Sequence, residues 1–235
     1  MTNVEYALQF VTDGMSLGLG SGRAAERFIS ALGDRVRAGL TIRAVPTSRA
    51  SAALARQAGI PLVEFDAAIP LDLTVDGADE VDSRLDLIKG YGHALVREKV
   101  VAAAARQFVI LIGPEEVEDK LVDVLGRRGR VPVEVLPFAE RFCVDRIHTA
   151  FGYLAEPVRD HQGERIISDN GNRLIDVRVG RIADPYALDA GLRAIPGVIG
   201  TGLFLGMADV VLIQRGDGRT EARPRTRSPT LGSSA

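Results

Sequence analysis

The chain has 235 residues, of which 46% are apolar and 26% charged, as expected of a globular protein large enough to bury a core. Its net charge of −2 argues against non-specific binding to nucleic acid, which needs a basic surface. One cysteine, Cys143, excludes an internal disulfide, and no long apolar run or signal-peptide pattern indicates a membrane segment, so we expect a cytoplasmic protein.

The first half of the chain is predicted to alternate between strands and helices. A short helix over 4–11 is followed by a buried strand over 15–19, a glycine-rich turn and a helix over 24–32. Later come strands over 41–45, 61–65, 71–75, 85–88 and 108–112, with helices over 50–58 and 94–106. This alternation is typical of an α/β fold with a doubly wound, mostly parallel, Rossmann-like sheet.

The glycine-rich turn reads Gly18-Leu19-Gly20-Ser21-Gly22 and directly precedes a helix. A helix that begins in such a turn presents bare N–H groups, which favours anion binding. Turns of this composition also serve plain chain reversal, so the turn alone leaves both interpretations open.

From about residue 126 the pattern changes. The elements predicted there fit a smaller ferredoxin-like α+β domain, which has the order β-α-β-β-α-β. Its elements are strands over 131–135, 156–158, 166–168, 174–179 and 197–205, with helices over 139–149 and 185–194. We expect 1–125 and 205–214 to form an α/β catalytic domain, 126–204 the small domain, and the Arg/Pro-rich residues 215–235 a disordered tail. The run 208–213 is expected to rejoin the first sheet.

The stretch 71–101 holds most of the candidate chemistry. One apolar run ends in the acids Asp76, Asp79, Glu80 and Asp82, and the next ends in Lys89, Gly90, Tyr91 and Gly92 before a helix that carries Glu98. Ligands of open α/β sheets bind outside the carboxyl ends of the strands. A proton-transfer site needs a carboxylate base, a second acid and a positive spot for a developing oxyanion, and this stretch supplies all three.

Lysine usage points to the same stretch. Lys89, Lys99 and Lys120 are the only lysines among 29 basic residues. An ammonium is compact and its pKa responds to burial, whereas a guanidinium is always charged, so a chain that favours arginine is expected to keep lysine where arginine would not serve. The alternative is an ordinary surface position, which fits Lys89 least because it lies between an apolar run and glycines.

These motifs resemble type A ribose-5-phosphate isomerase from about Ala7 to about Ile213. The family's loops read approximately GxGTGST, DGADE, KGGGxALxREK, LGxxPxPVEVxPFA, TDNGNxxxD and IPGVxxxGLF. Their counterparts here are Gly18–Ala24, Asp76–Val81, Lys89–Lys99, Leu125–Ala139, Ser168–Asp176 and Ile195–Phe204. The resemblance implies a cofactor-free and metal-free interconversion of ribose 5-phosphate and ribulose 5-phosphate through an enediolate, by a homodimer or homotetramer.

The resemblance also implies roles by position. Glu98 would move the proton between two carbons, and Asp76, with Asp79 beside it, would assist ring opening and proton traffic. Lys89 and the amides that follow it would stabilise the enediolate oxygen. The implied substrate-binding residues are Gly20, Ser21, Gly22, Arg23, Ala24, Gly90, Tyr91, Gly92 and Lys120. For Asp82 a solvated or capping role is favoured.

The chain departs from the family pattern in its phosphate loop and its glycine run. Arg23 and Ala24 stand where the family has Ser and Thr; the arginine could replace the lost donors or point to solvent. Tyr91 could narrow the sugar pocket or add a stacking wall, and His93 could be an acid–base group or an exposed residue. The family's last strand is expected to be replaced by the tail.

Two functions remain open on these grounds. One is an active isomerase of ribose 5-phosphate or of an altered sugar; the other is a paralogue that binds a sugar phosphate without turnover. The intact set of Asp76, Asp79, Lys89 and Glu98 favours the enzyme, because a binding protein has no need of a positioned base.

Overall fold

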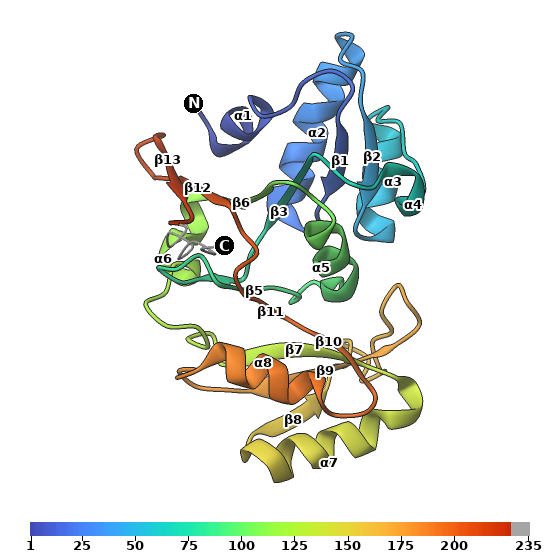
Figure 1. Ribbon diagram of the computed structural model, residues 1–235, viewed down its shortest axis with the longest axis vertical. Helices are drawn as coiled ribbons and strands as arrows, with labels where there is room; N and C mark the ends of the chain where they lie inside the picture. Colours follow the sequence, from blue (N-terminus) through green and yellow to red (C-terminus); the bar gives the residue numbers. More distant parts are fainter. Residues whose placement is uncertain (227–235) are drawn as a thin grey trace, which may run out of the picture.

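The computed structural model describes residues 1–226, which form two lobes with a small sheet between them (Figure 1). The large lobe is built on a six-stranded sheet in the order β13-β12-β6-β3-β1-β2. Its strands are parallel except at one edge, where β13 pairs antiparallel with β12. The strands are β1 (Ser16–Leu19), β2 (Arg43–Pro46), β3 (Leu73–Gly77), β6 (Phe108–Ile112), β12 (Val210–Gln214) and β13 (Thr220–Pro224). The predicted α/β fold with a mostly parallel sheet is confirmed.

Apolar cores lie on both faces of this sheet, so its central strands β3 and β6 are buried along their whole lengths. In β6, Val109 and Leu111 join the core shared with α1 and α2, whereas Ile110 joins the core on the opposite face, as the two-residue period of a strand requires. The helical elements of this lobe are α1 (Asn3–Leu8), α2 (Arg23–Arg37), α3 (Arg49–Gln57), α4 (Phe65–Ala68), α5 (Leu95–Ala103), the 3₁₀ turn η1 (Pro114–Glu116) and α6 (Val117–Lys120).

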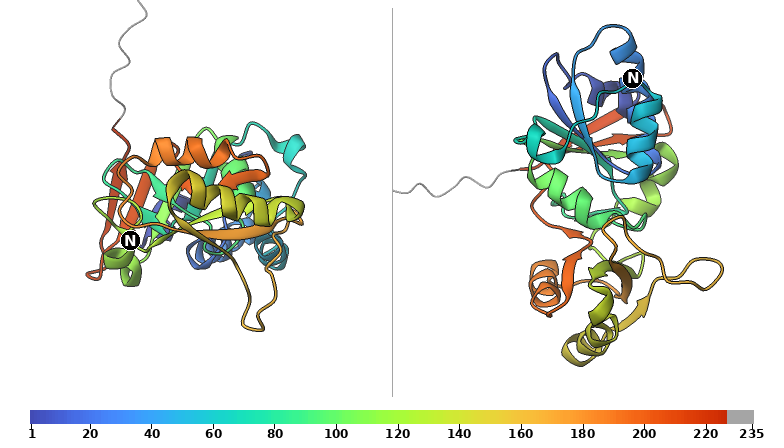
Figure 2. Two further views of the ribbon diagram at one scale, coloured as in Figure 1. Left: turned by 90° about the horizontal axis from the view of Figure 1, so that it is seen from below. Right: turned by 90° about the vertical axis from the view of Figure 1, so that its right-hand side faces the viewer.

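The small lobe is an antiparallel sheet with two helices packed on one core. The sheet order is β10-β7-β9-β8, and the chain order of strands and helices is the predicted β-α-β-β-α-β. Its elements are β7 (Arg130–Val135), η2 (Pro137–Ala139), α7 (Glu140–Phe151), β8 (Leu154–Pro157), β9 (Arg173–Arg178), α8 (Pro185–Arg193) and β10 (Val198–Thr201). Cys143 and Ile147 of α7 and Leu192 of α8 are buried in this core. Figure 2 shows the two lobes and a loop that projects from the small one.

A three-stranded antiparallel sheet lies between the lobes, in the order β11-β5-β4: β4 (Glu80–Val81), β5 (Leu87–Ile88) and β11 (Leu203–Phe204). The strand predicted over 85–88 therefore does not belong to the parallel sheet. Asp82 closes a turn by accepting hydrogen bonds from the amides of Arg84 (2.9 Å) and Asp86 (2.8 Å), and Leu85 has a φ of 61° within it. This turn reverses the chain, so β5 begins at Leu87 and pairs with β4.

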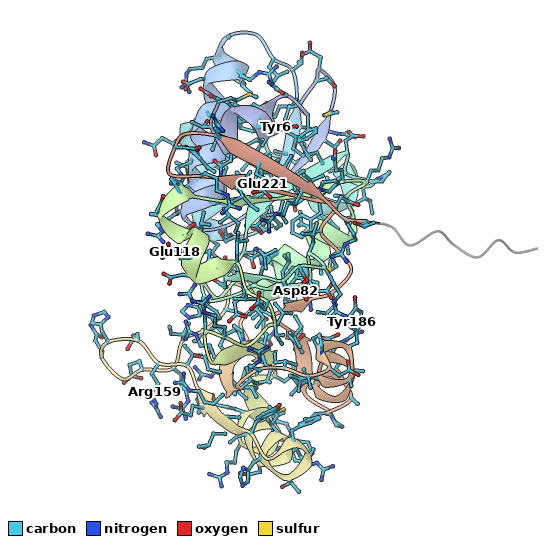
Figure 3. All side chains as sticks on the ribbon, turned by 90° about the vertical axis from the view of Figure 1, so that its left-hand side faces the viewer. Tyr6, Asp82, Glu118, Arg159, Tyr186 and Glu221 are labelled. Atoms are coloured by element: carbon cyan, nitrogen blue, oxygen red, sulfur yellow. The ribbon has the colours of Figure 1, made fainter. Side chains whose placement is uncertain are left out.

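The expectation of a disordered tail from residue 215 is wrong for the part that the structure describes. β13 pairs with β12 along its whole length, from Thr220 opposite Gln214 to Pro224 opposite Val210, and Figure 3 shows Glu221 on this edge strand. The tail's arginines find oxygen acceptors: Arg215 lies 2.6 Å from Glu221, and Arg225 donates to a backbone carbonyl of the 82–86 turn (2.6 Å). The last strand is thus present and not replaced; residues 227–235 lie outside the described part.

Two further predicted strands are reduced to single bridges. The segment 61–65 touches the edge strand β2 only where Leu62 lies opposite Ala44, because α4 already begins at Phe65. The segment 166–168 pairs only where Ile167 lies opposite Arg173, at the base of the projecting loop on which Figure 3 labels Arg159. Among residues 1–226, no helix has both the length and the apolar character needed to span a membrane.

Candidate active site

A cavity of about 860 Å³ lies at the carboxyl ends of the parallel strands. The turn after β1, the start of α3 after β2, the end of β3 and the elements after β6 all contribute to its wall, and a small-lobe segment, 166–169, closes one side. The next two strands in the chain, β2 and β3, lie on opposite sides of β1 in the sheet. Such a switch point is where open α/β sheets bind ligands.

Close backbone packing at the switch point requires glycine. A Cβ on Gly20 would lie 2.2 Å from Oδ1 of Asp76, so no larger residue fits between the β1 turn and the end of β3. The same Asp76 oxygen accepts hydrogen bonds from the amides of Ser21 (3.1 Å) and Gly77 (2.7 Å). Asp76 therefore ties the glycine-rich turn to β3, and it lies outside the cavity wall with a fully buried side chain.

Lys89 stands between two buried carboxylates. Its Nζ lies 2.9 Å from Asp76 Oδ2 and 3.5 Å from Glu98 Oε2, and it donates to the carbonyl of Gly77 at 2.6 Å. Only 3% of the lysine side chain is exposed. Burial opposes its charge, but the carboxylates of Asp76 and Glu98 outweigh that effect and raise the lysine pKa above its usual value. Lys89 is thus a fixed cation in the cavity wall.

Glu98 is delivered to the same wall by the first turn of α5. Its Oε2 makes no hydrogen bond within residues 1–226, although Lys89 is the nearest cation. Burial raises the pKa of Glu98, Lys89 opposes that rise, and the negative charges of Asp76 and Asp79 add to it. A carboxylate with a raised pKa and an unused oxygen at a cavity wall is suited to accept a proton near neutral pH.

Tyr91 forms one side of the cavity, held by polar and ring contacts. Its amide donates to Asp79 Oδ2 (3.0 Å) and its hydroxyl to the carbonyl of Arg130 (3.1 Å). The guanidinium carbons of Arg130 and Arg128 lie 4.0 and 5.1 Å from the ring centroid. Tyr91 thus lines the cavity with its ring against two guanidinium groups, and both predictions for it, a narrower sugar pocket or a stacking wall, stay predictions. Asp79 lines the cavity, as do Gly90 and Gly92; Gly90 has a φ of 105°.

The glycine-rich turn presents the N-terminus of a long helix to the cavity. Gly22, with a φ of 83°, precedes α2, whose first residues Arg23 and Ala24 line the wall. Amides of a first helical turn have no acceptor within the helix, so they can receive an anion. The Ser21 hydroxyl holds the turn in place through the hydroxyls of Ser48 (2.7 Å), Thr47 (2.9 Å) and Ser51 (3.1 Å).

A residue that sequence reasoning missed joins two of the side chains predicted to bind substrate. Glu116 Oε1 lies 2.6 Å from Arg23 Nη2, and its Oε2 lies 3.1 Å from Lys120 Nζ. All three residues line the cavity. The i,i+4 spacing of Glu116 and Lys120 could have signalled their pairing, but Arg23 is 93 residues away in the chain.

The remaining candidates lie elsewhere or play other parts. Glu80 and Asp82 are outside the cavity wall: Glu80 accepts hydrogen bonds from the amides of Gly126 and Arg128 (both 2.6 Å), and Asp82 closes the turn already described and is buried, not solvated. Lys99 donates to the backbone carbonyls of Thr201 at the end of β10 (2.7 Å) and Leu203 at the start of β11 (2.8 Å). His93 lines the cavity half-buried, and burial lowers its pKa.

Among residues 1–226, no group of His, Cys, Asp or Glu side chains is arranged to hold a metal ion. Two sets of charged side chains do converge. The first places two carboxylates around a lysine, and the second places two cations around a glutamate. The first is suited to proton transfer beside a developing negative charge, and the second to binding an anion.

Comparisons with known proteins agree on one family. A sequence profile described as ribose 5-phosphate isomerase A (phosphoriboisomerase A) matches residues 43–218. Ribose-5-phosphate isomerase A of Methylorubrum extorquens is 46% identical over 221 residues, with 92% of each chain covered. That of Thermomicrobium roseum is 47% identical over 227 residues, covering 96% of this chain and 94% of the relative.

Solved structures give the same result. Ribose 5-phosphate isomerase A from Methanocaldococcus jannaschii superposes with a TM-score of 0.87 at 38% identity, covering 95% of this chain and 96% of that one. A D-ribose-5-phosphate isomerase in complex with phospho-erythronic acid gives a TM-score of 0.88 at 38% identity, with the same coverage.

Proposed function

Since the chain belongs to the ribose 5-phosphate isomerase A family, we propose that it interconverts ribose 5-phosphate and ribulose 5-phosphate, with Glu98 as the base. The observation that carries this proposal is the buried Asp76–Lys89–Glu98 set, of which Lys89 and Glu98 line the cavity. It combines a carboxylate whose pKa is raised with a fixed ammonium 3.5 Å away. Those are the two groups that an enediolate reaction requires.

The proposed reaction moves one carbon-bound proton. Glu98 takes the proton from carbon 2 of the open-chain aldose; the C2–H electrons form the C1–C2 double bond, and the carbonyl oxygen on carbon 1 becomes the enediolate oxygen. The hydroxyl proton then passes from the oxygen on carbon 2 to that on carbon 1, and Glu98 returns its proton to carbon 1. The carbonyl now lies on carbon 2, and no other atom has been gained or lost.

Lys89 stabilises the negative oxygen in this scheme. Its ammonium has three protons, of which one is donated to Gly77 and one faces Asp76, so one is left for the enediolate. Asp76 lies behind Lys89 and outside the cavity wall, so its proposed part is to hold the ammonium. The transfer of hydroxyl protons and ring opening fall to Asp79, which lines the cavity.

The phosphate is proposed to bind at the start of α2. The amides of Gly22, Arg23 and Ala24 supply donors, and the side chains of Arg23 and Lys120 supply charge. Ala24 brings no hydroxyl, and its buried methyl packs near Gly77. In this proposal the guanidinium of Arg23 replaces the hydroxyl donors that the family has at these two positions. The phospho-erythronic acid complex of a solved relative supports a phosphorylated ligand for this family.

A turnover assay over a small substrate panel tests this proposal. We expect ribose 5-phosphate to be isomerised faster than other aldose phosphates and far faster than free ribose. Faster turnover of another aldose phosphate would assign an altered sugar specificity. Saturable binding of ribose 5-phosphate with no turnover of any panel member would establish the binding-only paralogue and refute the isomerase.

We also propose that the chain acts as a homodimer in the cytoplasm. Support comes from apolar side chains left exposed on the small lobe near the junction of β7 and α7: Leu136, Phe138, Phe142 and Ile199. Phe138 is fully exposed, and large exposed apolar patches commonly mark interfaces. Sedimentation should give a dimer for the wild type and a monomer for Phe138→Asp. A monomeric wild type would refute the dimer.

The proposed cytoplasmic location is supported by the cysteine content. A lone cysteine with a buried thiol is compatible with a reducing compartment.

A further inference from the structure

Glu116 holds a position in the cavity that the proposed reaction does not use. Its side chain is 6% exposed, whereas that of its partner Arg23 is 74% exposed and that of Lys120 is 13% exposed. One carboxylate oxygen bonds the guanidinium, and the other is buried, with the ammonium as its nearest charge. A buried anion thus pairs with two cations, and all three residues line the cavity.

A short segment that follows β6 places this carboxylate. β6 ends at Ile112, and the Gly113-Pro114 step starts the 3₁₀ turn that contains Glu116. α6 follows at once and brings Lys120 one helical turn later onto the same side. Arg23 meets them from the start of α2, so the three charges join elements at the carboxyl ends of β1 and β6.

The arrangement reduces the conformational freedom of the proposed phosphate ligands. Arginine and lysine side chains have many rotamers, and ordering them when a ligand binds weakens the affinity. A cation already held by a buried carboxylate needs less ordering, and the set keeps a net charge of +1 toward the cavity. Fixed, pre-oriented charge also binds an anion better than mobile charge does.

We infer that Glu116 is a positioning residue that fixes Arg23 and Lys120 at the cavity wall and thereby sets the affinity of this site for a phosphate group. The inference rests on the proposed function for the identity of the substrate, but it applies to inorganic phosphate as well. Glu116 itself does not touch the reacting carbons, so its influence is expected on binding and not on the chemical step.

The test compares Glu116→Gln with Glu115→Gln. Glu115 is the adjacent residue, half-exposed, paired with Arg27 at 3.1 Å and absent from the cavity wall, so it is a matched control. We expect Glu116→Gln to raise KM for ribose 5-phosphate and the inhibition constant of inorganic phosphate by about tenfold each, with kcat within about twofold of wild type. Glu115→Gln should leave all three values unchanged.

A double-mutant cycle with Arg23→Ala shows whether Glu116 acts through that arginine. Glu116→Gln should lose part of its effect on phosphate affinity when Arg23 is already alanine, because one of the two residues it positions is gone, and the same holds in a Lys120→Ala background. Full additivity in both backgrounds would overturn the inference. So would a lower KM in Glu116→Gln, which would make the carboxylate a competitor of the phosphate.

Direct calorimetric titration with inorganic phosphate separates this inference from the proposed reaction. If the wild type binds phosphate and Glu116→Gln binds it about tenfold more weakly, the inference holds whether or not ribose 5-phosphate is turned over. Equal phosphate affinity of wild type and Glu116→Gln would refute it even in a fully active isomerase.

Discussion

Two charge triads of opposite composition contribute side chains to the cavity wall. The inner triad has two carboxylates, Asp76 and Glu98, around one lysine, and all three side chains are at most 5% exposed. The outer triad has two cations, Arg23 and Lys120, around the single carboxylate of Glu116, and its arginine is largely exposed. Burial raises the pKa of the base in the inner triad against the opposing effect of Lys89, whereas the excess positive charge of the outer triad attracts an anion.

Burial decides what each triad contributes. Breaking a buried ion pair leaves an uncompensated charge that destabilises the fold by roughly 3–5 kcal/mol. An ion pair with an exposed member contributes about 0–1 kcal/mol to stability. Its loss should therefore lower the affinity for the ligand more than the free energy of unfolding. Changes in the inner triad should therefore couple activity to stability, whereas loss of the exposed Arg23 in the outer triad should affect binding alone.

The largest effect is expected from removing the base of the inner triad. Glu98→Gln keeps the shape of the side chain but cannot accept the carbon-bound proton, so kcat should fall by about 10²–10⁴-fold. The fold should be retained, because glutamine introduces no buried charge. Steady-state kinetics with ribose 5-phosphate measures the loss, and unchanged phosphate binding is the control. A variant with normal kcat would remove Glu98 from the mechanism.

Lys89 should show the coupling of stability and activity. Lys89→Ala leaves Asp76 and Glu98 facing each other without a cation, so the free energy of unfolding should fall by roughly 3–5 kcal/mol, with turnover largely lost. Lys89→Arg should restore charge but little activity, because the planar guanidinium cannot occupy the site of a compact ammonium. Denaturant unfolding and kcat report the two quantities. Wild-type kcat in the arginine variant would show that any positive charge suffices.

The pH dependence of the reaction should reflect the raised pKa of Glu98. The base acts in its ionised form, so kcat/KM should be constant above that pKa and fall about tenfold per pH unit below it. Because burial raises the pKa, this decline should begin well above the usual glutamate value of about 4.3. A profile that stays flat down to pH 5 would contradict the assignment.

The smallest effect is expected in the outer triad. Arg23→Ala should raise KM for ribose 5-phosphate by about tenfold, as expected for the loss of a charge-assisted bond worth roughly 1.5–3 kcal/mol. Turnover of any unphosphorylated sugar and the melting temperature should stay nearly unchanged. Equal effects on phosphorylated and unphosphorylated substrates would mean that Arg23 does not bind phosphate.

The two triads also differ in how far the sequence predicts them. Asp76, Lys89 and Glu98 lie within one short stretch that the sequence alone singles out, and the structure brings their side chains together. The small antiparallel sheet that contains β5 places Lys89, which the sequence pattern did not predict. Arg23 and Glu116 meet only through the sheet order that places β1 and β6 near the same cavity, which no local pattern indicates. The role of Glu116 therefore requires the tertiary structure.

The errors in predicting the fold have a similar origin. The strand at Leu87 has the apolar character of a parallel strand, but a turn closed by Asp82 directs it into a separate antiparallel sheet. Residues 220–224 read as a polar, disordered tail, yet β12 offers them a free sheet edge. Composition reports solubility and propensity, whereas pairing partners are decided by the whole chain.

Exchange of hydrogen at carbon 2 of ribose 5-phosphate tests the central claim, proton transfer by Glu98, most directly. The substrate is equilibrated with enzyme in deuterium oxide over many turnovers, and deuterium at carbon 2 is followed by NMR. We expect deuterium to accumulate with the wild type and not with Glu98→Gln. Isomerisation by the wild type without any incorporation, or incorporation by Glu98→Gln at the wild-type rate, would contradict the account.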